Sequence, residues 1–216
     1  MQISESDLGH DLPITILMIG HEVPPDGPVR LDDLAGGTGR LDVLIRGLQT
    51  GLLTSHGLRR DVVFDWLLCN GSEDRWRWVR WVGRDLRGVS ADERSIGGHV
   101  RSVLREKVAR NRWTRHAPGL FSRRATLNKV LGSWKEFDRA VVVLSKDSPS
   151  LQGPLVAGTK IGLVVSDHLP LTPTEGEEMS GHEAIEASVG PRWLQGHSAI
   201  VLALAVLDGD ITILPT

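Results

Sequence analysis

Ile14-Thr15-Ile16-Leu17-Met18-Ile19-Gly20 is the stretch of sequence that decides the fold. A short apolar run that ends at a glycine predicts a buried strand. Further runs of this kind lie at 61–68 (DVVFDWLL), 141–145 (VVVLS), 161–165 (IGLVV) and 211–214 (ITIL). Apolar residues at helical spacing follow Arg40, with Gly57 as the expected stop, and recur over 197–207. Strands that alternate with helices predict an α/β fold with a largely parallel sheet flanked by helices.

The middle of the chain carries weaker signals. Residues 21–39 are rich in Pro, Asp and Gly, which is typical of a long loop. Residues 76–82 (WRWVRWV) alternate Trp or Val with Arg, so we expect a strand that packs its tryptophans and turns its arginines outward. Ser90 and Glu93 match a capping box at a helix start. A basic helix is expected from about Ser122 to Trp134.

Composition indicates a folded, reduced protein. The 216 residues are 40% hydrophobic and 24% charged, within the globular range. The only cysteine, Cys69, allows no internal disulfide and argues against a cysteine-built metal site. The early apolar run is too short for a signal peptide or a membrane span, so a cytoplasmic location without membrane contact is expected.

Positive charge is concentrated in one segment. The segment from Arg75 to Arg124 contains fourteen Lys or Arg residues and four acidic residues. It therefore carries +10 within a chain of net charge −2. Such a distribution is typical of a protein that binds an anionic partner such as a nucleic acid. A solvated helix face with long basic side chains gives the same pattern.

The sequence lacks the complete signature of several enzyme classes. Gly36-Gly37-Thr38-Gly39 before a helix has neither the P-loop ending nor the Rossmann spacing, and a turn that caps a helix explains it better. The histidines form no zinc signature, so no metal is expected. Arg59-Arg60-Asp61, at the entry to a strand, fits either phosphate binding or a structural ion pair.

Several strings in order resemble one family over nearly the whole chain. They are DLAGGTGRLD (33–42), SHGLRRDVV (55–63), VSADERS (89–95), GLVVSDH (162–168), SVGP (188–191) running to Leu194, and the closing Leu207-Asp208. Together they resemble the archaeal tRNA pseudouridine-54 N1-methyltransferases of the SPOUT superfamily. The resemblance implies a single domain over 1–216 with a carboxyl-terminal trefoil knot. Residues of about 10–135 would face RNA, and about 138–216 would form the knotted cofactor-binding part.

The resemblance also implies S-adenosylmethionine as cofactor, tRNA as substrate and a homodimer as the working form. The matching cofactor positions are Leu144, Ser166, Ser188, Val189, Gly190, Pro191, Arg192, Trp193, Leu194 and Ala199. Two of them depart from the family pattern, because Ser166 replaces a usual glycine and Ala199 replaces a common cysteine.

Asp61 is the candidate base for the N1 proton, since it stands beside two arginines, and Asp92 is the second choice. The candidate RNA-binding residues are Arg40, Arg59, Arg60, Arg94, Arg101, Arg105, Arg123 and Arg124.

Three alternatives stay open at this point. A related knotted enzyme methylates pseudouridine in small-subunit ribosomal RNA, and other members of the superfamily methylate the ribose 2′-hydroxyl. A chain that keeps the fold but no longer binds the cofactor would instead be a non-catalytic RNA-binding or assembly factor.

Overall fold

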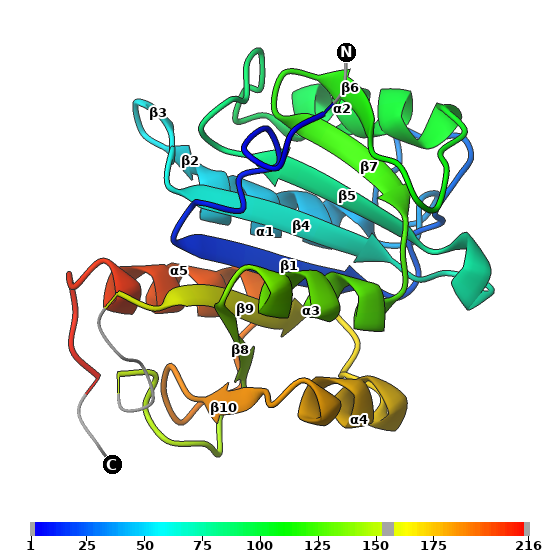
Figure 1. The fold of residues 1–216 in the computed structure, drawn as a ribbon. Coiled ribbons are helices and arrows are strands. Elements are labelled where there is room, and N and C mark those ends of the chain that lie inside the picture. Colours follow the sequence, from blue (N-terminus) through cyan, green and yellow to red (C-terminus); the bar gives the residue numbers. More distant parts are fainter. Residues whose placement is uncertain (1–2, 153–157, 214–216) are drawn as a thin grey trace.

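A mixed sheet with helices on both faces forms the framework of the molecule (Figure 1). The computed structural model describes residues 3–152 and 158–213. Across the sheet the strands are β10 (Ile185–Ala187), β8 (Arg139–Leu144), β9 (Lys160–Ser166), β1 (Ile14–Gly20), β4 (Val62–Leu68), β5 (Arg77–Val82), β7 (Leu120–Arg124) and β6 (Thr114–Ala117). The five strands from β10 to β4 are parallel, and the remaining three pair antiparallel. The predicted α/β fold with a mainly parallel sheet is confirmed.

β1 lies between β9 and β4, and all seven of its residues are buried. Ile16 and Met18 contribute to the core on one face, whereas Leu17 and Ile19 contribute to the core on the other. Because both faces are covered, the strand is apolar along its whole length rather than alternating.

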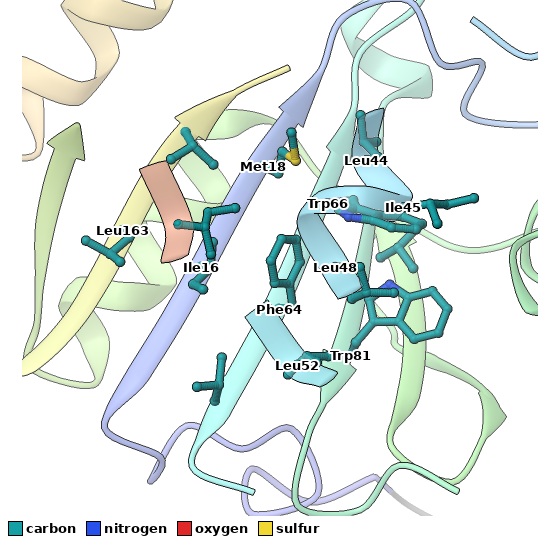
Figure 2. Packing of buried hydrophobic residues seen from close by; sticks show 14 of the residues in the cluster. Ile16, Met18, Leu44, Ile45, Leu48, Leu52, Phe64, Trp66, Trp81 and Leu163 are labelled. Carbon is teal, nitrogen blue, oxygen red and sulfur yellow. The ribbon is translucent and has the colours of Figure 1, made fainter. Parts of the chain in front are cut away.

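Helices α1 (Leu41–Leu52), α2 (Glu93–Arg105) and α5 (Gly196–Leu207) pack on the first face. Figure 2 shows Leu44 and Leu48 of α1 close to Phe64 and Met18 of the sheet. Helices α3 (Leu127–Glu136) and α4 (Pro173–Gly181) supply buried residues to the second face, among them Trp134 and Met179. Burial of these apolar faces against one sheet is the main favourable contribution to folding.

The prediction that the arginines of 76–82 face outward is wrong. Arg77 and Arg80 are both buried, with relative exposures of 0% and 1%. Arg80 forms a bidentate pair with Asp65 on the neighbouring strand β4, with N–O distances of 2.8 and 2.9 Å. Arg77 donates to the carbonyls of Val103 and Glu106 at the end of α2. Both faces of β5 are covered, so these charges are neutralised or hydrogen-bonded inside the protein.

Two predicted helix starts need correction. α2 begins at Glu93 and is capped by Asp92, whose carboxylate accepts from the Ser95 amide at 2.7 Å, so the Ser90–Glu93 capping box is wrong. The basic helix predicted from Ser122 is strand up to Arg124, because β7 pairs with β5 there. The helical part, α3, starts after Thr126, which caps it.

The ends of two other predicted elements also differ. α1 stops at Leu52, and Gly57 belongs to a small hairpin of β2 (Leu53–Thr54) and β3 (Gly57–Leu58). Residues 211–213 form no strand, and Leu214 lies outside the described residues. Sequence patterns did not indicate α4, β6 or β10, which are short or lack a clear apolar period.

Candidate active site

A cavity of about 490 Å³ opens where the parallel strands β8 and β9 end. Its walls are the ends of these strands, the loops that follow them, the loop after β10 and the start of α5. Loops at the carboxyl ends of parallel strands are the usual place for ligands in open α/β sheets. The cavity volume is in the range of small-molecule sites.

Eight of the ten predicted cofactor residues line this cavity. They are Leu144, Ser166, Val189, Gly190, Arg192, Trp193, Leu194 and Ala199. Positions from three separate stretches of sequence thus converge on one space, while their role in binding stays a prediction. The sequence did not indicate Lys146, His168 or Glu186, which also line the cavity.

Ser188 and Pro191 are not among the lining residues. Ser188 is buried, and its hydroxyl lies within hydrogen-bonding distance of the Lys146 and Gly190 carbonyls, at 3.2 and 3.0 Å. Its amide donates to the Pro149 carbonyl at 2.7 Å. Ser188 therefore connects the loop after β8 with the loop after β10, and it shapes the cavity without facing it.

The Ser166 hydroxyl is held within its own loop, because it donates to the Leu169 carbonyl. Nearby, α5 approaches the end of β9 so closely that a Cβ on Gly196 would lie 2.8 Å from the Ser166 carbonyl oxygen. Glycine at the start of α5 is what allows this helix to form one wall of the cavity.

Carboxylates and a histidine reinforce the cavity wall formed by residues 167–171. His21, directly after β1, places Nδ1 2.9 Å from Asp167 Oδ1 and Nε2 3.2 Å from Glu175 Oε2. Hydrogen bonds from His21 to Asp167 and then Glu175 raise the pKa of the imidazole to about 9. Burial raises the pKa of the Asp167 carboxyl, but the hydrogen bonds from His21 and the Leu169 amide outweigh it, so this pKa is lowered overall.

The candidate base Asp61 lies at the opposite edge of the sheet. It precedes β4, whose first residue is in register with Ile14, whereas the cavity lies beyond the last residues of the parallel strands. Seven residues of β4 span roughly 20 Å. Asp61 accepts a hydrogen bond from Arg59 at 2.9 Å. Within one chain, Asp61 and the cavity are therefore not adjacent.

Asp92, the second candidate base, is exposed and caps α2. Gln49, near the end of α1, donates to the Ala91 carbonyl beside it. α1 follows β1 back across the sheet, so its end, and Asp92 with it, lie on the Asp61 side. The structure therefore places both candidate bases away from the cavity.

Several predicted RNA-binding arginines are already engaged inside the chain. Arg59 forms two 2.6 Å contacts with the carboxylate of Asp208 at the end of α5, and its side chain is 16% exposed. Arg60 donates to the carbonyls of Gly83, Arg84 and Leu86. Each of these bonds stabilises a loop at the edge where the parallel strands begin.

The two arginines of β7 are also held within the fold. The guanidinium of Arg123 stacks on Trp78 and Trp113, and burial lowers its pKa to about 10. Arg124 is half-buried and donates to Asp26. Of the fourteen basic residues counted in this segment, only Arg77 and Arg80 are buried and eight are exposed, so most of its positive charge faces solvent.

Four predicted RNA-binding residues are more accessible. Arg94 and Arg105 on α2 are exposed, and Arg101 on the same helix is half-buried. Arg40, which precedes α1, is 39% exposed and pairs with Asp42. An RNA contact stays a prediction for all eight arginines.

The Gly36–Gly39 segment is a structural turn. A Cβ on Gly39 would lie 2.0 Å from the Glu22 carbonyl oxygen, and Gly39 has a φ of +60°. The Thr38 hydroxyl donates to the Asp33 carbonyl at 3.3 Å. These contacts make the segment a packed turn just before α1, whose N-cap residue Arg40 makes no side-chain capping bond.

Neither a metal site nor a membrane span is seen among residues 3–152 and 158–213. In the part of the chain that the structure describes, no group of three or more His, Cys, Asp or Glu side chains could hold a metal ion. None of the helices seen there is both long and apolar enough to cross a membrane.

Comparisons with known proteins agree over nearly the whole chain. The tRNA (pseudouridine(54)-N(1))-methyltransferase of Methanococcoides burtonii is 30% identical over 91% of this chain and 96% of its own length. The enzyme of the same name from Methanosarcina acetivorans is 32% identical over 89% and 90%. The crystal structure of Archaeoglobus fulgidus Nep1 bound to S-adenosylhomocysteine has a TM-score of 0.61 over 92% of this chain and all of that chain. At 11% identity it supports the fold alone. Residues 15–211 match the family model described as putative SAM-dependent RNA methyltransferase, and this chain belongs to that family.

Proposed function

We propose that this protein transfers a methyl group from S-adenosylmethionine to N1 of pseudouridine 54 in tRNA. The observation that carries the proposal is the match to two enzymes named for this reaction, at 30% and 32% identity over about nine tenths of each chain. The cavity supports it, because it lies where the predicted cofactor positions converge.

The residues around the cavity fit the proposed cofactor. Leu144 and Val189 offer an apolar surface for the adenine ring. The Glu186 carboxylate can accept hydrogen bonds from ribose hydroxyls, and the Lys146 ammonium can pair with the amino-acid carboxylate. When bound, S-adenosylmethionine supplies a methyl group on a sulfonium centre, which is already a good leaving group. The chain's main task is therefore to position the base, a source of roughly 7–11 kcal/mol in well-oriented reactions.

Asp61 is the proposed group that accepts or orients the N1 proton. Arg59 holds its carboxylate, and Asp208 fixes Arg59 in turn. A positioned base contributes about 10²–10⁴-fold to a rate. Asp92 is the second candidate.

A homodimer would bring Asp61 of one copy close to the cavity of the other copy. α5 runs from the cavity, where Gly196 meets Ser166, to the Asp61 edge, where Asp208 binds Arg59. Val201, halfway along α5, is 50% exposed. Two copies packed through antiparallel α5 helices would place the Asp61 edge of each beside the cavity of the other, as a two-fold axis requires.

Exposed hydrophobic side chains are consistent with this dimer interface. Among residues 3–152 and 158–213, all the large ones that are exposed lie in the carboxyl-terminal part. They are Leu169, Trp193, Leu194, Val201 and Ile211. Leu169, Trp193 and Leu194 line the cavity and Val201 lies on α5, and exposed apolar side chains of this size often mark a protein interface.

Other parts of the proposal follow from the same family resemblance. The carboxyl-terminal part would be threaded as a trefoil knot, residues 10–135 would face RNA and residues 138–216 would hold the cofactor. Arg94, Arg101 and Arg105 would contact phosphates of a tRNA whose base 54 is splayed or flipped out of its loop. We propose a cytoplasmic location, where tRNA is modified.

The test is methyl transfer from labelled S-adenosylmethionine to two matched tRNA transcripts, one with pseudouridine and one with uridine at position 54. We expect incorporation only into the pseudouridine transcript, with the methyl group mapped to N1. Binding of the cofactor without transfer to either transcript would contradict the tRNA assignment and favour ribosomal RNA. A methylated ribose hydroxyl would contradict the N1 assignment, and loss of both binding and transfer would favour a non-catalytic RNA-binding protein.

A further inference from the structure

We infer that protonated His21 is a positioning residue that holds the 167–171 wall of the cavity in place by bridging two buried carboxylates. The inference deepens the proposed function, on which it rests for the identity of the cofactor. Asp167 stands at one end of this wall, and Glu175 lies just beyond the other end, on the first turn of α4. Residues 167–171 all line the cavity.

The register of the sheet brings these groups together. Ile19 of β1 pairs with Ser166 of β9, so the residues that follow the two strands emerge side by side. The Asp167 amide donates to the Ile19 carbonyl at 3.1 Å, and the His21 amide donates to Asp167 Oδ2 at 2.9 Å. The backbone of His21 is thereby held beside Asp167 independently of the contacts that its ring makes.

Both ring nitrogens of His21 face carboxylate oxygens. An ionised carboxylate only accepts hydrogen bonds, and a neutral imidazole has one N–H to donate. The two contacts, at 2.9 Å to Asp167 and 3.2 Å to Glu175, are both hydrogen bonds only when both nitrogens carry protons. The side chains of His21, Asp167 and Glu175 are 12%, 0% and 7% exposed, so solvent screens the bridge weakly.

The same carboxylates order the wall itself. Asp167 Oδ1 accepts from the Leu169 amide at 2.9 Å, and Glu175 Oε2 accepts from the Thr172 amide at 2.7 Å. Without the positive charge between them, two carboxylates buried close together would repel each other or take up protons. Either change weakens the bonds that hold the backbone from Asp167 to Thr172.

Other charged groups near the bridge come from every neighbouring element. His168 Nδ1 lies 3.6 Å from Asp167 Oδ2, and its Nε2 lies 3.2 Å from Glu22. Three titratable groups lie further away and interact electrostatically with the two carboxylates of the bridge. They are Arg40 before α1, Cys69 after β4 and Glu178 on α4. Burial raises the pKa of the Cys69 thiol, so that group stays neutral where His21 titrates.

The experiment compares the full chain with two glutamine variants. His21→Gln removes the charge and one of the two donors. His182→Gln is the matched control, because His182 ends the same helix α4 but bonds to Asn128, away from the cavity. First, ¹⁵N-detected NMR of the histidine rings should show both nitrogens of His21 protonated at pH 7, with deprotonation near pH 9. One protonated ring nitrogen at pH 7 would overturn the inference.

Second, hydrogen exchange of the Leu169 and Thr172 amides is measured without any cofactor. Loss of a charge-assisted network should speed their exchange by about 10–100-fold in His21→Gln and leave His182→Gln unchanged. Equal exchange in wild type and His21→Gln would overturn the inference. This readout needs neither cofactor nor tRNA, so it decides the role of His21 even if the proposed function fails.

Third, calorimetry with S-adenosylhomocysteine connects the wall to the cavity. The dissociation constant should rise about tenfold or more in His21→Gln, with a matching rise in the KM for S-adenosylmethionine and little change in kcat. In wild type, affinity should weaken as pH rises through about 9, whereas the variant should be flat over this range. A lower kcat with unchanged KM would contradict a positioning role.

If His21→Gln does not fold, Glu175→Gln replaces it, since glutamine also serves at the third position of a capping box. The bridge then loses one carboxylate, and the pKa of His21 should fall toward its ordinary value. An unchanged titration in this variant would overturn the bridge.

Discussion

The two ends of β1 carry histidines in different electrostatic surroundings. His10 lies ahead of the strand, where Arg80 Nη1 is 3.2 and 3.4 Å from its ring nitrogens and Arg139 donates to its carbonyl. The exposed Glu5 carboxylate lies 3.3 Å from Nε2 of the same ring. Burial, followed by the nearby Arg80, lowers the pKa of His10 to about 2. His21 lies after the strand among carboxylates, and its pKa rises to about 9. Burial lowers the pKa of both imidazoles, and only at His21 do hydrogen bonds to two carboxylates outweigh it.

The difference between the two histidines coincides with a difference in content between the two ends of the parallel strands. The edge where the parallel strands begin holds Arg59, Arg60 and the candidate base Asp61, whereas the edge where they end holds the cavity. Substitutions at the first edge should affect the RNA step or the fold, and substitutions at the second should affect the cofactor.

The largest effect should come from breaking the buried ion pair between Arg80, which contacts His10, and Asp65. Asp65→Leu leaves Arg80 buried without its carboxylate, which typically costs about 3–5 kcal/mol of unfolding free energy. Denaturant unfolding measures this loss. The double variant Asp65→Leu with Arg80→Met is the control and should recover most of it, since paired apolar replacements are often neutral. A loss below about 1 kcal/mol would show that Arg80 reaches water or another partner in the variant.

The second-largest effect should be the loss of methyl transfer when Asp61 is replaced, at the edge where the parallel strands begin. Asp61→Asn should lower single-turnover methyl transfer by about 10²–10⁴-fold and leave the affinity for S-adenosylhomocysteine unchanged. Asp92→Asn is the matched variant, because Asp92 is exposed and caps α2. Full turnover in Asp61→Asn together with lost turnover in Asp92→Asn would transfer the role of base to Asp92.

The third prediction concerns stability against pH, where the two histidines act with opposite sign. The raised pKa of His21 contributes stability fully below about pH 6.5, and this contribution is lost as pH rises through about 9. His10 binds its proton only in the unfolded chain, so stability falls as pH drops below about 6.5. We expect a maximum near pH 6.5.

Denaturant unfolding from pH 5 to 10 measures both slopes, in a range above the ordinary carboxyl pKa values. His21→Gln should flatten the alkaline slope and His10→Asn the acidic one. A variant that flattens the wrong slope would reverse the assignment of charge at the two ends of β1.

The smallest effect should come from a single surface arginine. Arg94→Ala should reduce the slope of log affinity for tRNA against log salt by about 0.7–0.9, the share of one phosphate contact. Lys135→Ala is the control, since Lys135 is an exposed cation on α3, across the sheet from α2. Equal slopes for Arg94→Ala and wild type would remove Arg94 from the RNA surface.

The apolar runs of the sequence were sufficient for four of the five parallel strands, all but the short β10. β1, β4, β8 and β9 follow from continuous apolar runs, and α1 and α5 follow from helical spacing. The antiparallel strands were harder, because the pairing of Asp65 with Arg80 lets a buried strand carry alternating charge. A sequence does not distinguish an arginine neutralised across a strand pair from one in water.

The cavity was located from the family resemblance rather than from residue patterns. Leu144, Ser166 and Ala199 lie far apart in sequence and come together through strand order. The bridge at His21 was missed for the same reason, since its partners Asp167 and Glu175 follow 146 and 154 residues later. Only the adjacency of β1 and β9 makes them neighbours.

Trp193 has a consequence for spectroscopy. It is 80% exposed at the cavity, 5.2 Å from the Lys146 ammonium, while Trp66, Trp78, Trp81 and Trp134 are fully buried. An indole in water emits at longer wavelength than buried indoles and is open to a soluble quencher. Its fluorescence is therefore separable from that of the four buried tryptophans, while Trp76 and Trp113 are half-buried. The protein carries its own optical reporter at the mouth of the cavity.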